Sequence, residues 1–489
     1  PTFMLCSSFK HSRNLLPLAG LLFCAAGYAQ TGSAQPQPVA SHPTVTQPAA
    51  AAGTQGTTLI QQGEYLAKAA DCEVCHTATG GQTFAGGLGF KTPFGTIFSS
   101  NITPAKTHGI GQWSEKQFSD ALRYGIRADG KNLYPAMPYT SYSKLTDADI
   151  HAMYAFFMSL KPVATDPPEN KMGFPYNQRI ALKGWNLINF HYQPFKQDPD
   201  QSAEWNRGHY LATALGHCEE CHTPRNLAMG LSDKSYAGAM VDGWEAFNIS
   251  SDNTSGIGRW SHADLMQYLR TGSVPGVATT GGGMADVISH SLRFLSNDDL
   301  SALATYIKSV PPQKTASQNR SGYGDNVQSD ITQAVRGMAI DDSAPSGAVL
   351  FNGNCASCHG TKGQGIGENR YYPSLSNNSV VGADKANNLV QVILHGIDRT
   401  NGKGEHIVMP GFGDELTDSQ IATLTNYLRT NFGTNPAPVD AAQVKALREN
   451  NVMVIPGYLL ILGGVISVII LVAIIMYFRR RKAARNHAG

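Results

Sequence analysis

Three pentapeptides of the form C-x-x-C-H constrain this chain more than any other feature. They are Cys72-Glu73-Val74-Cys75-His76, Cys218-Glu219-Glu220-Cys221-His222 and Cys355-Ala356-Ser357-Cys358-His359. Two thiols three residues apart reach the two vinyl groups on one edge of a porphyrin, and the histidine that follows then lies beneath the iron as an axial ligand. The pattern predicts three covalently bound c haems. Their attachment points are the six cysteines, and their proximal metal ligands are His76, His222 and His359.

Two other interpretations of the motif fit the sequence less well. A zinc site takes four ligands, usually from two paired motifs, and three distant copies do not pair evenly. A thioredoxin-like C-x-x-C requires a βαβ setting, which the surrounding pattern does not indicate. The chain has eight cysteines, of which Cys6 and Cys24 lie near the N-terminus and the other six lie in the motifs. The motifs therefore leave no thiol over for a structural disulfide or a catalytic nucleophile.

A methionine follows each motif at a distance suited to a second axial ligand. Met137 comes 61 residues after His76, Met284 comes 62 after His222, and Met409 comes 50 after His359. A thioether is the usual partner of histidine in electron-carrying c haems, and it raises the reduction potential. The alternative is that these are packing methionines in the core. We predict that all three are distal metal ligands.

An internal repeat organises the first two motifs. Gly63-Glu64-Tyr65-Leu66-Ala67 precedes Cys72, and Gly208-His209-Tyr210-Leu211-Ala212 precedes Cys218 in the same way. Helix-start signals recur as well, with an N-cap residue before an amphipathic run. These predicted N-caps are Ser114, Thr146, Ser296 and Thr417. The sequence thus predicts a mainly α fold class, with three tandem cytochrome c-like domains plus one C-terminal transmembrane helix.

Composition shifts set the predicted boundaries. Residues 166–200 form an aromatic linker, expected either to pack between haem domains or on a partner, or to dip into a membrane interface. The predicted division is signal peptide 1–29, disordered linker 30–58, cytochrome c domain 59–165, aromatic linker 166–200, cytochrome c domain 201–312, linker 313–345, cytochrome c domain 346–435, linker 436–457, transmembrane helix 458–478 and cytoplasmic basic tail 479–489.

The two ends of the chain predict its location. Lys10 and Arg13 precede an apolar run that ends in small residues, as in a secretory signal peptide. Residues 458–478 carry no charge and would span a bilayer as a helix, and the basic residues that follow predict a cytoplasmic end. We therefore expect a protein of the bacterial inner membrane, with haem domains in the periplasm and the C-terminus in the cytoplasm.

The chain resembles the cytochrome c subunit of membrane-bound quinone-dependent alcohol, aldehyde and gluconate dehydrogenases of acetic acid bacteria. The resemblance rests on Tyr134-Pro135-Ala136-Met137-Pro138-Tyr139, Cys221-His222-Thr223-Pro224-Arg225 and Gly256-Ile257-Gly258-Arg259-Trp260-Ser261. It implies that the chain takes electrons from a separate catalytic subunit, either a quinoprotein or a molybdopterin subunit with an iron–sulfur subunit. The acceptor implied is ubiquinone. The C-terminal apolar run slightly favours the aldehyde dehydrogenase branch.

Other function classes remain open at this point. The chain could be the cytochrome c subunit of a terminal oxidase or a free-standing, membrane-anchored electron carrier. A haem peroxidase would need an iron without a sixth ligand, which the three methionines argue against. No dinucleotide fingerprint or iron–sulfur cysteine set is present, so we expect no catalytic residues of substrate oxidation in this chain. The net charge of +2 gives no reason to invoke nucleic acid.

Overall fold

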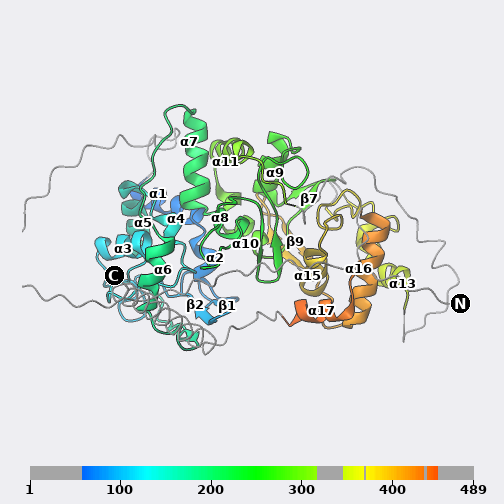
Figure 1. The fold of residues 1–489 in the computed structure, drawn as a ribbon, viewed down its shortest axis with the longest axis horizontal. Helices are drawn as coiled ribbons and strands as arrows, with labels where there is room; N and C mark the ends of the chain where they lie inside the picture. The colour runs from blue at the N-terminus through cyan, green and yellow to red at the C-terminus, as the bar shows by residue number, and fades with distance from the viewer. Residues whose placement is uncertain (1–57, 316–344, 368–370, 434–437, 450–489) are drawn as a thin grey trace, which may run out of the picture. The chain divides into compact units, whose positions relative to one another are not determined.

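The computed structural model describes residues 58–315, 345–367, 371–433 and 438–449 (Figure 1). Nearly all of them belong to one of two contact units, which comprises Gln47–Met172 and Tyr176–Met453; of the other unit only Gly173–Pro175 is described. The predicted signal peptide, most of the linkers 30–58 and 313–345, and residues 458–489 lie outside the described residues. We keep the three predicted cytochrome c domains as a proposal and call residues 59–165, 201–312 and 346–435 the first, second and third segments.

Short helices and small antiparallel hairpins make up all three segments. The first segment and the linker after it contain α1 (Leu59–Ala69), α2 (Cys72–His76), β1 (Gly89–Thr92), β2 (Gly95–Phe98), α3 (Glu115–Tyr124), α4 (Tyr139–Tyr142), α5 (Asp147–Ser159), β3 (Lys171–Met172) and α6 (Ala181–Asn189). The second contains α7 (Ala203–Tyr210), the π-helix η1 (Leu211–Leu215), α8 (Glu219–His222), β4 (Ala239–Val241), β5 (Trp244–Ala246), α9 (His262–Thr271), β6 (Ser273–Val274), β7 (Ala278–Thr279), α10 (Gly283–His290), the 3-10 helix η2 (Leu292–Phe294) and α11 (Asn297–Ser309). The third segment and the residues after it contain α13 (Gly347–Asn354), α14 (Ala356–His359), α15 (Asn387–His395), β8 (Ile397–Thr400), β9 (His406–Met409), α16 (Asp418–Phe432) and α17 (Ala441–Arg448).

The four predicted N-caps are confirmed. Ser114, Thr146, Ser296 and Thr417 each have an extended backbone, and the side chain of each accepts a hydrogen bond from the amide three residues later. This bond satisfies one of the amides that a helix leaves unpaired at its start. The local signal for where these helices begin was therefore sufficient without tertiary information.

A glycine brings the first and last helices of a segment into backbone contact. A Cβ added at Gly63 in α1 would lie 1.9 Å from the carbonyl oxygen of Ala152 in α5. The second segment repeats this contact, because a Cβ at Gly208 in α7 would lie 1.9 Å from the carbonyl oxygen of Ala302 in α11. Figure 1 shows α7 and α11 side by side. This close crossing fixes the helix that leads into each of the first two motifs.

The first and second segments exchange equivalent hydrogen bonds. The Tyr65 hydroxyl donates to Asp299 Oδ2 at 2.6 Å, and the Tyr210 hydroxyl donates to Asp149 Oδ2 at 2.5 Å. The two tyrosines occupy the same place in the internal repeat, so each segment donates one tyrosine hydrogen bond to an aspartate of the other segment. This reciprocity is that of an isologous, two-fold interface. The two segments accordingly share one apolar core, which runs from Leu66 to Ile307, whereas the third segment has a core of its own.

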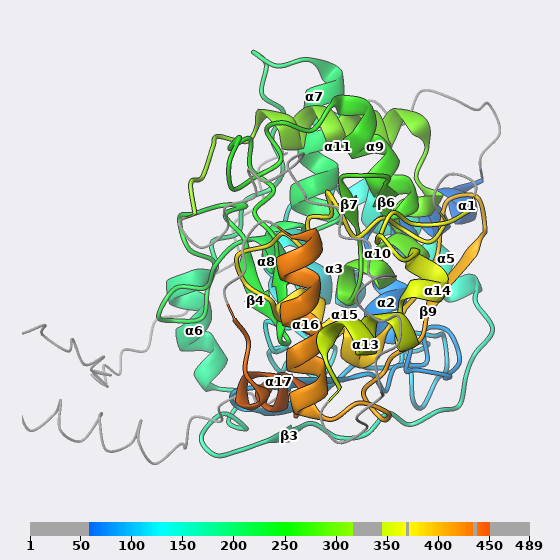
Figure 2. The same ribbon diagram turned by 90° about the vertical axis from the view of Figure 1, so that its right-hand side faces the viewer.

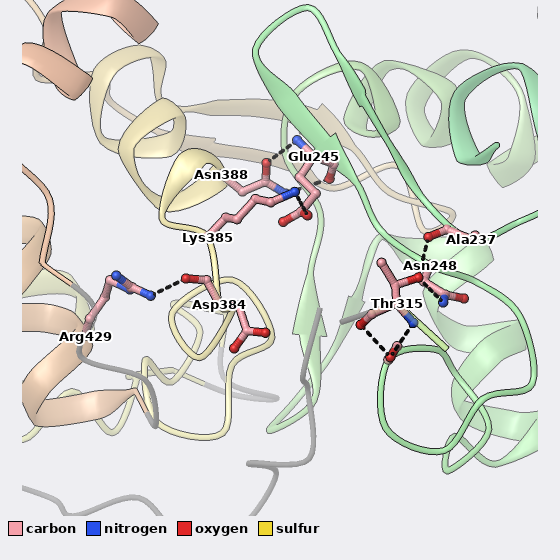
Figure 3. A network of polar contacts seen from close by, with 9 residues as sticks. Ala237, Glu245, Asn248, Thr315, Asp384, Lys385, Asn388 and Arg429 are labelled. Carbon is pink, nitrogen blue, oxygen red and sulfur yellow. Dashed lines mark hydrogen bonds and ion pairs between the residues drawn. The ribbon is translucent and has the colours of Figure 1, made fainter. Parts of the chain in front are cut away.

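A buried polar network joins the second and third segments (Figure 3). The Asn388 side chain in α15 accepts a hydrogen bond from the backbone N–H of Glu245 at 2.7 Å and donates to its carbonyl at 2.9 Å. Lys385 Nζ lies 3.1 Å from Glu245 Oε1. Because the Asn388 amide completes β5 as a neighbouring strand would, the third segment is fixed at the edge of the second.

The residues after the third segment hold a helix that we assigned to a linker. Figure 2 shows α17 beside α16. The Val444 side chain of α17 is fully buried, and Arg448 Nε donates to Asp418 Oδ1 at 2.7 Å at the start of α16. This helix therefore belongs to the packed body of the third segment.

The predictions of fold class and of localisation need correction. Helix makes up 41% and strand 10% of the described residues, because the loops after the motifs fold into hairpins, so this part of the chain is less helical than the mainly α class. In the described ranges no helix is long and apolar enough to cross a bilayer. The longest, α16, has 15 residues, whereas a span takes about 20. The predicted transmembrane helix at 458–478 lies outside the described residues, and the inner-membrane anchor with a cytoplasmic C-terminus that it implied finds no support.

Candidate haem sites

Each C-x-x-C-H motif begins where a preceding helix breaks. In the first two motifs the residue before the first cysteine has a left-handed backbone, with φ of 56° at Asp71 and 36° at His217. This conformation turns the chain sharply, so that α2 and α8 start in a new direction after α1 and η1. In the third segment α13 ends at Asn354 and α14 begins at Ala356. The sequence therefore places all three motifs on a short helical turn after a longer helix.

In each of the three motif histidines, Nδ1 makes a hydrogen bond with a backbone carbonyl. His76 Nδ1 lies 2.7 Å from the carbonyl oxygen of Ser100, His222 Nδ1 lies 2.6 Å from that of Phe247, and His359 Nδ1 lies 2.8 Å from that of Pro373. A carbonyl oxygen only accepts, so Nδ1 carries the proton in each ring. The lone pair is then on Nε2, which is the tautomer of a metal-binding histidine oriented by a backbone carbonyl. Burial lowers the pKa of His76 and of His359, which keeps these rings neutral.

The six motif cysteines are free thiols. Burial raises the pKa of Cys75, Cys218 and Cys355 to about 12 and that of Cys221 to about 11. At neutral pH these thiols are therefore protonated, and none is paired with another in a disulfide. Each motif thus presents two sulfurs that are available for thioether bonds to a porphyrin.

The third motif faces an apolar hollow. The residues that line it include Cys355, His359 and the predicted ligand Met409. Most of the remaining lining is aliphatic, from Leu375, Val380, Val381, Leu389, Val392, Ile393, Ile397, Leu424 and Leu428. The structure thus brings the predicted cysteine, histidine and methionine of this site to one cavity, whose surface suits the apolar body of a porphyrin.

Met137 and Met284 are half-buried against the core shared by the first two segments. Met137 lies just before α4, and Met284 is the second residue of α10. The helix after Met137, α4, and the helix that contains Met284, α10, each contact the motif of the other segment. Thr140 Oγ1 in α4 donates to Glu220 Oε1 of the second motif at 2.9 Å, and His290 at the end of α10 lies 3.1 Å from Glu73 Oε1 of the first. The two motifs are therefore interlocked, which the linear spacing of the sequence does not reveal.

Three further features near the motifs have no counterpart in the sequence-based predictions. The carbonyl partners of the histidines come from loops 14 to 25 residues further along the chain and have no side-chain signal. Thr279 of the second segment lines the hollow of the third motif. Asp71, beside Cys72, is buried, and burial raises its pKa well above the usual range. Only the twofold repeat of the sequence hinted that the first two motifs belong together.

The aromatic linker contributes α6, which bridges the first two segments. Asn186 Oδ1 accepts from the Tyr139 hydroxyl at 2.7 Å, and Trp185 Nε1 donates to the carbonyl of Ala228 at 2.9 Å. None of the α6 side chains is fully buried, and Leu187 is 81% exposed. The inner face of this helix therefore packs between the segments, in line with one of the two expectations, while the outer face is open.

These residues fit haem c at all three motifs. Each motif offers two free thiols and a histidine whose Nε2 is the unprotonated nitrogen, and the third also offers a methionine in the same apolar hollow. Among the described residues no group of three or more histidine, cysteine or acidic side chains could hold a bare metal ion.

Comparisons with known proteins place the first and third motifs within a cytochrome c family match. The cytochrome c family model matches residues 60–161 and 344–432. The chain is 42% identical to the fructose dehydrogenase cytochrome subunit of Gluconobacter japonicus over 424 residues, which cover 83% of this chain and 87% of the relative.

Two further relatives come from other dehydrogenases. The alcohol dehydrogenase (quinone), cytochrome c subunit of Gluconobacter oxydans is 39% identical over 81% of this chain and 83% of its own length. The gluconate 2-dehydrogenase cytochrome c subunit of Pantoea cypripedii is 39% identical over 81% of this chain and 90% of its own. The shared features are a covalently bound haem c and a role as the electron-transfer subunit beside a catalytic dehydrogenase subunit. The chain belongs to the family of cytochrome c subunits of quinone-dependent dehydrogenase complexes.

Proposed function

We propose that this chain carries three c haems, one at each motif, and passes electrons from a catalytic dehydrogenase subunit to ubiquinone. The observation that carries the proposal is the threefold recurrence of one arrangement. In each copy two free thiols precede a histidine whose Nδ1 is bonded to a backbone carbonyl. A structural zinc or redox motif would have no reason to repeat this histidine orientation three times.

The six cysteines would hold the three haems, and His76, His222 and His359 would be their proximal ligands. Met137, Met284 and Met409 would be the distal ligands. Each haem supplies reversible one-electron storage when bound. The chain itself fixes each imidazole through a carbonyl, excludes water with aliphatic side chains, and offers a soft thioether that favours ferrous iron and so raises the potential.

Substrate oxidation belongs, in this proposal, to the partner subunit. The relatives named above are subunits of dehydrogenases for fructose, an alcohol and gluconate. All three substrates have a hydroxyl-bearing carbon, so we propose that the partner oxidises a sugar, a sugar acid or an alcohol. We rank an aldehyde below these substrates of the partner subunit. The preference for an aldehyde rested on the apolar run at 458–478, which lies outside the described residues.

Purification of the native complex tests this function. We expect a large catalytic subunit to co-purify, and addition of its substrate without oxygen to reduce the haem absorption of this chain. Ubiquinone added afterwards should reoxidise it. The chain separated from its partner should not be reduced by substrate. Co-purification with a haem–copper oxidase and no dehydrogenase would instead support the terminal-oxidase alternative, and reduction of the isolated chain by substrate would contradict the division of labour.

A further inference from the structure

A buried arginine lies at the junction of the second and third segments without an acidic partner. Arg399, in β8, is 4% exposed. Its Nη1 donates to the carbonyl of Thr271 at the end of α9, and its Nε has no hydrogen-bond partner. Among the described residues no carboxylate forms an ion pair with it. A guanidinium so deeply buried normally has an anion beside it, because desolvation of an unpaired charge is costly.

A second unpartnered polar group lies next to this arginine. Thr280, which follows β7 of the second segment, is 3% exposed, and its Oγ1 has no hydrogen-bond partner. Both side chains converge at Gly272. A Cβ there would lie 2.5 Å from Arg399 Nη1 and 2.6 Å from Thr280 Cγ2. Gly272, with φ of 71°, thus makes room for the guanidinium of Arg399 from one segment and the methyl group of Thr280 from the other.

This junction borders the hollow of the third motif. Ile397 and Arg399 are two residues apart in β8 and therefore lie on the same face of the strand. Ile397 lines the hollow, and so does Thr279, the neighbour of Thr280. The hollow itself is poor in polar side chains. Of those that line it, His359 is the predicted iron ligand, Asn378 is bonded to the backbone of Ser374 and Val380, and the Thr279 hydroxyl lies 3.4 Å from that of Ser273.

A haem c in that hollow brings two propionate carboxylates, and an apolar wall cannot solvate them. A guanidinium presents a planar fork of donors that matches a carboxylate, and a hydroxyl adds one further donor. We propose that Arg399 and Thr280 together bind a propionate of the third haem. This inference rests on the proposed haem at Cys355, Cys358 and His359. It makes the second segment part of the third haem's binding site and gives the junction a role in setting that haem's potential.

The test is a potentiometric titration of the purified, haem-loaded chain with Arg399→Gln, Arg399→Lys and Thr280→Val. A nearby cation stabilises the added electron, so its removal lowers the potential. In Arg399→Gln we expect the ratio of ferrous to ferric iron at one haem to fall about tenfold at a fixed applied potential, which corresponds to about 59 mV for one electron. Arg399→Lys keeps the charge without the fork and should recover part of the shift. The affected haem should be the one that Met409→Ala alters.

Arg270→Gln is the matched control. Arg270 lies at the same junction, where its backbone carbonyl accepts from Gly402 N, but its guanidinium is already bonded to the carbonyl of Arg293 and to Asn297 Oδ1. Its loss should leave all three potentials unchanged. An equal shift in this control would show that only the net charge of the junction matters and would overturn the proposal.

The remaining outcomes are equally decisive. Three bound haems with unchanged potentials in Arg399→Gln would overturn the inference and leave the proposed function intact. A shift confined to the haem that Met284→Ala alters would overturn the assignment to the third haem. If Arg399→Gln does not fold or loses haem, Thr280→Val decides, because it removes a single hydroxyl: a smaller negative shift of the same haem supports the proposal and no shift overturns it. Fewer than three haems in the unaltered chain would contradict the proposed function itself.

Discussion

Replacing Gly63 by alanine should separate the two helices that position the first motif. The new Cβ would lie 1.9 Å from the carbonyl oxygen of Ala152, 2.6 Å from its carbonyl carbon and 2.7 Å from Phe156 Cβ. Contacts this short do not occur, so α1 would have to move away from α5 by about 1 Å in a close-packed core. Overpacking of this kind costs about 1–3 kcal/mol, occasionally more, and the better helix propensity of alanine returns up to about 1 kcal/mol. We expect a net destabilisation of about 2 kcal/mol.

Urea denaturation of the haem-loaded chain measures this effect, followed by far-UV circular dichroism and by the Soret signal. Gly353→Ala is the control, since Gly353 lies inside α13 and a Cβ there meets no atom within 4 Å. That variant should be stabilised by about 0.5–1 kcal/mol. Gly208→Ala should behave like Gly63→Ala, because it makes the same contact in the second segment. A midpoint for Gly63→Ala at or above that of the control would refute the reasoning.

Three further predictions follow from the contacts around the motifs. Alanine at Met137, Met284 or Met409 should leave three haems attached but lower the potential of one, because the thioether favours ferrous iron; an unchanged titration would show that the methionine only packs. Tyr210→Phe should destabilise the chain by about 1.5–3 kcal/mol in denaturant titrations, and Tyr65→Phe by less, because Asp299 keeps its bidentate bond to Arg207; equal losses would argue against this asymmetry. The Glu73–His290 contact should stabilise the chain most between about pH 4.5 and 6.5. The hydrogen bond between them raises the pKa of His290 and lowers that of Glu73, so the histidine contribution is lost as pH rises through its raised pKa and the glutamate contribution as pH falls through its lowered one. His290→Gln should remove this dependence from a series of melting curves.

Local features of this chain could be predicted from its sequence, and contacts between distant residues could not. The N-caps at Ser114 and Thr417 each depend on a few neighbouring residues, so the pattern alone was enough to predict them. The hydrogen bond from Tyr65 to Asp299 joins residues 234 apart and has no local signal. The contact of Arg399 with Thr271 of the second segment likewise has no local signal in the sequence.

The internal repeat predicts two similar segments, but it does not predict that they pack against each other. The reciprocal hydrogen bonds between the two copies become visible only in the three-dimensional arrangement. The repeated Gly-x-Tyr-Leu-Ala sequence contains both devices, a glycine for the helix crossing and a tyrosine for the bond to the other copy. The predicted transmembrane helix at 458–478 rested on hydropathy alone, and these residues lie outside the part of the chain that the structure describes.

The number of covalent haems tests the central claim most directly. A pyridine haemochrome assay on the denatured chain, after acid–acetone extraction of any free haem, should give three haems per polypeptide. Double replacement of both cysteines of one motif by alanine should lower the count to two for each motif in turn, because the two thiols of that motif are the only attachment points it offers. A count of two in the unaltered chain, or a double variant that still holds three, would contradict the assignment of one c haem to each motif.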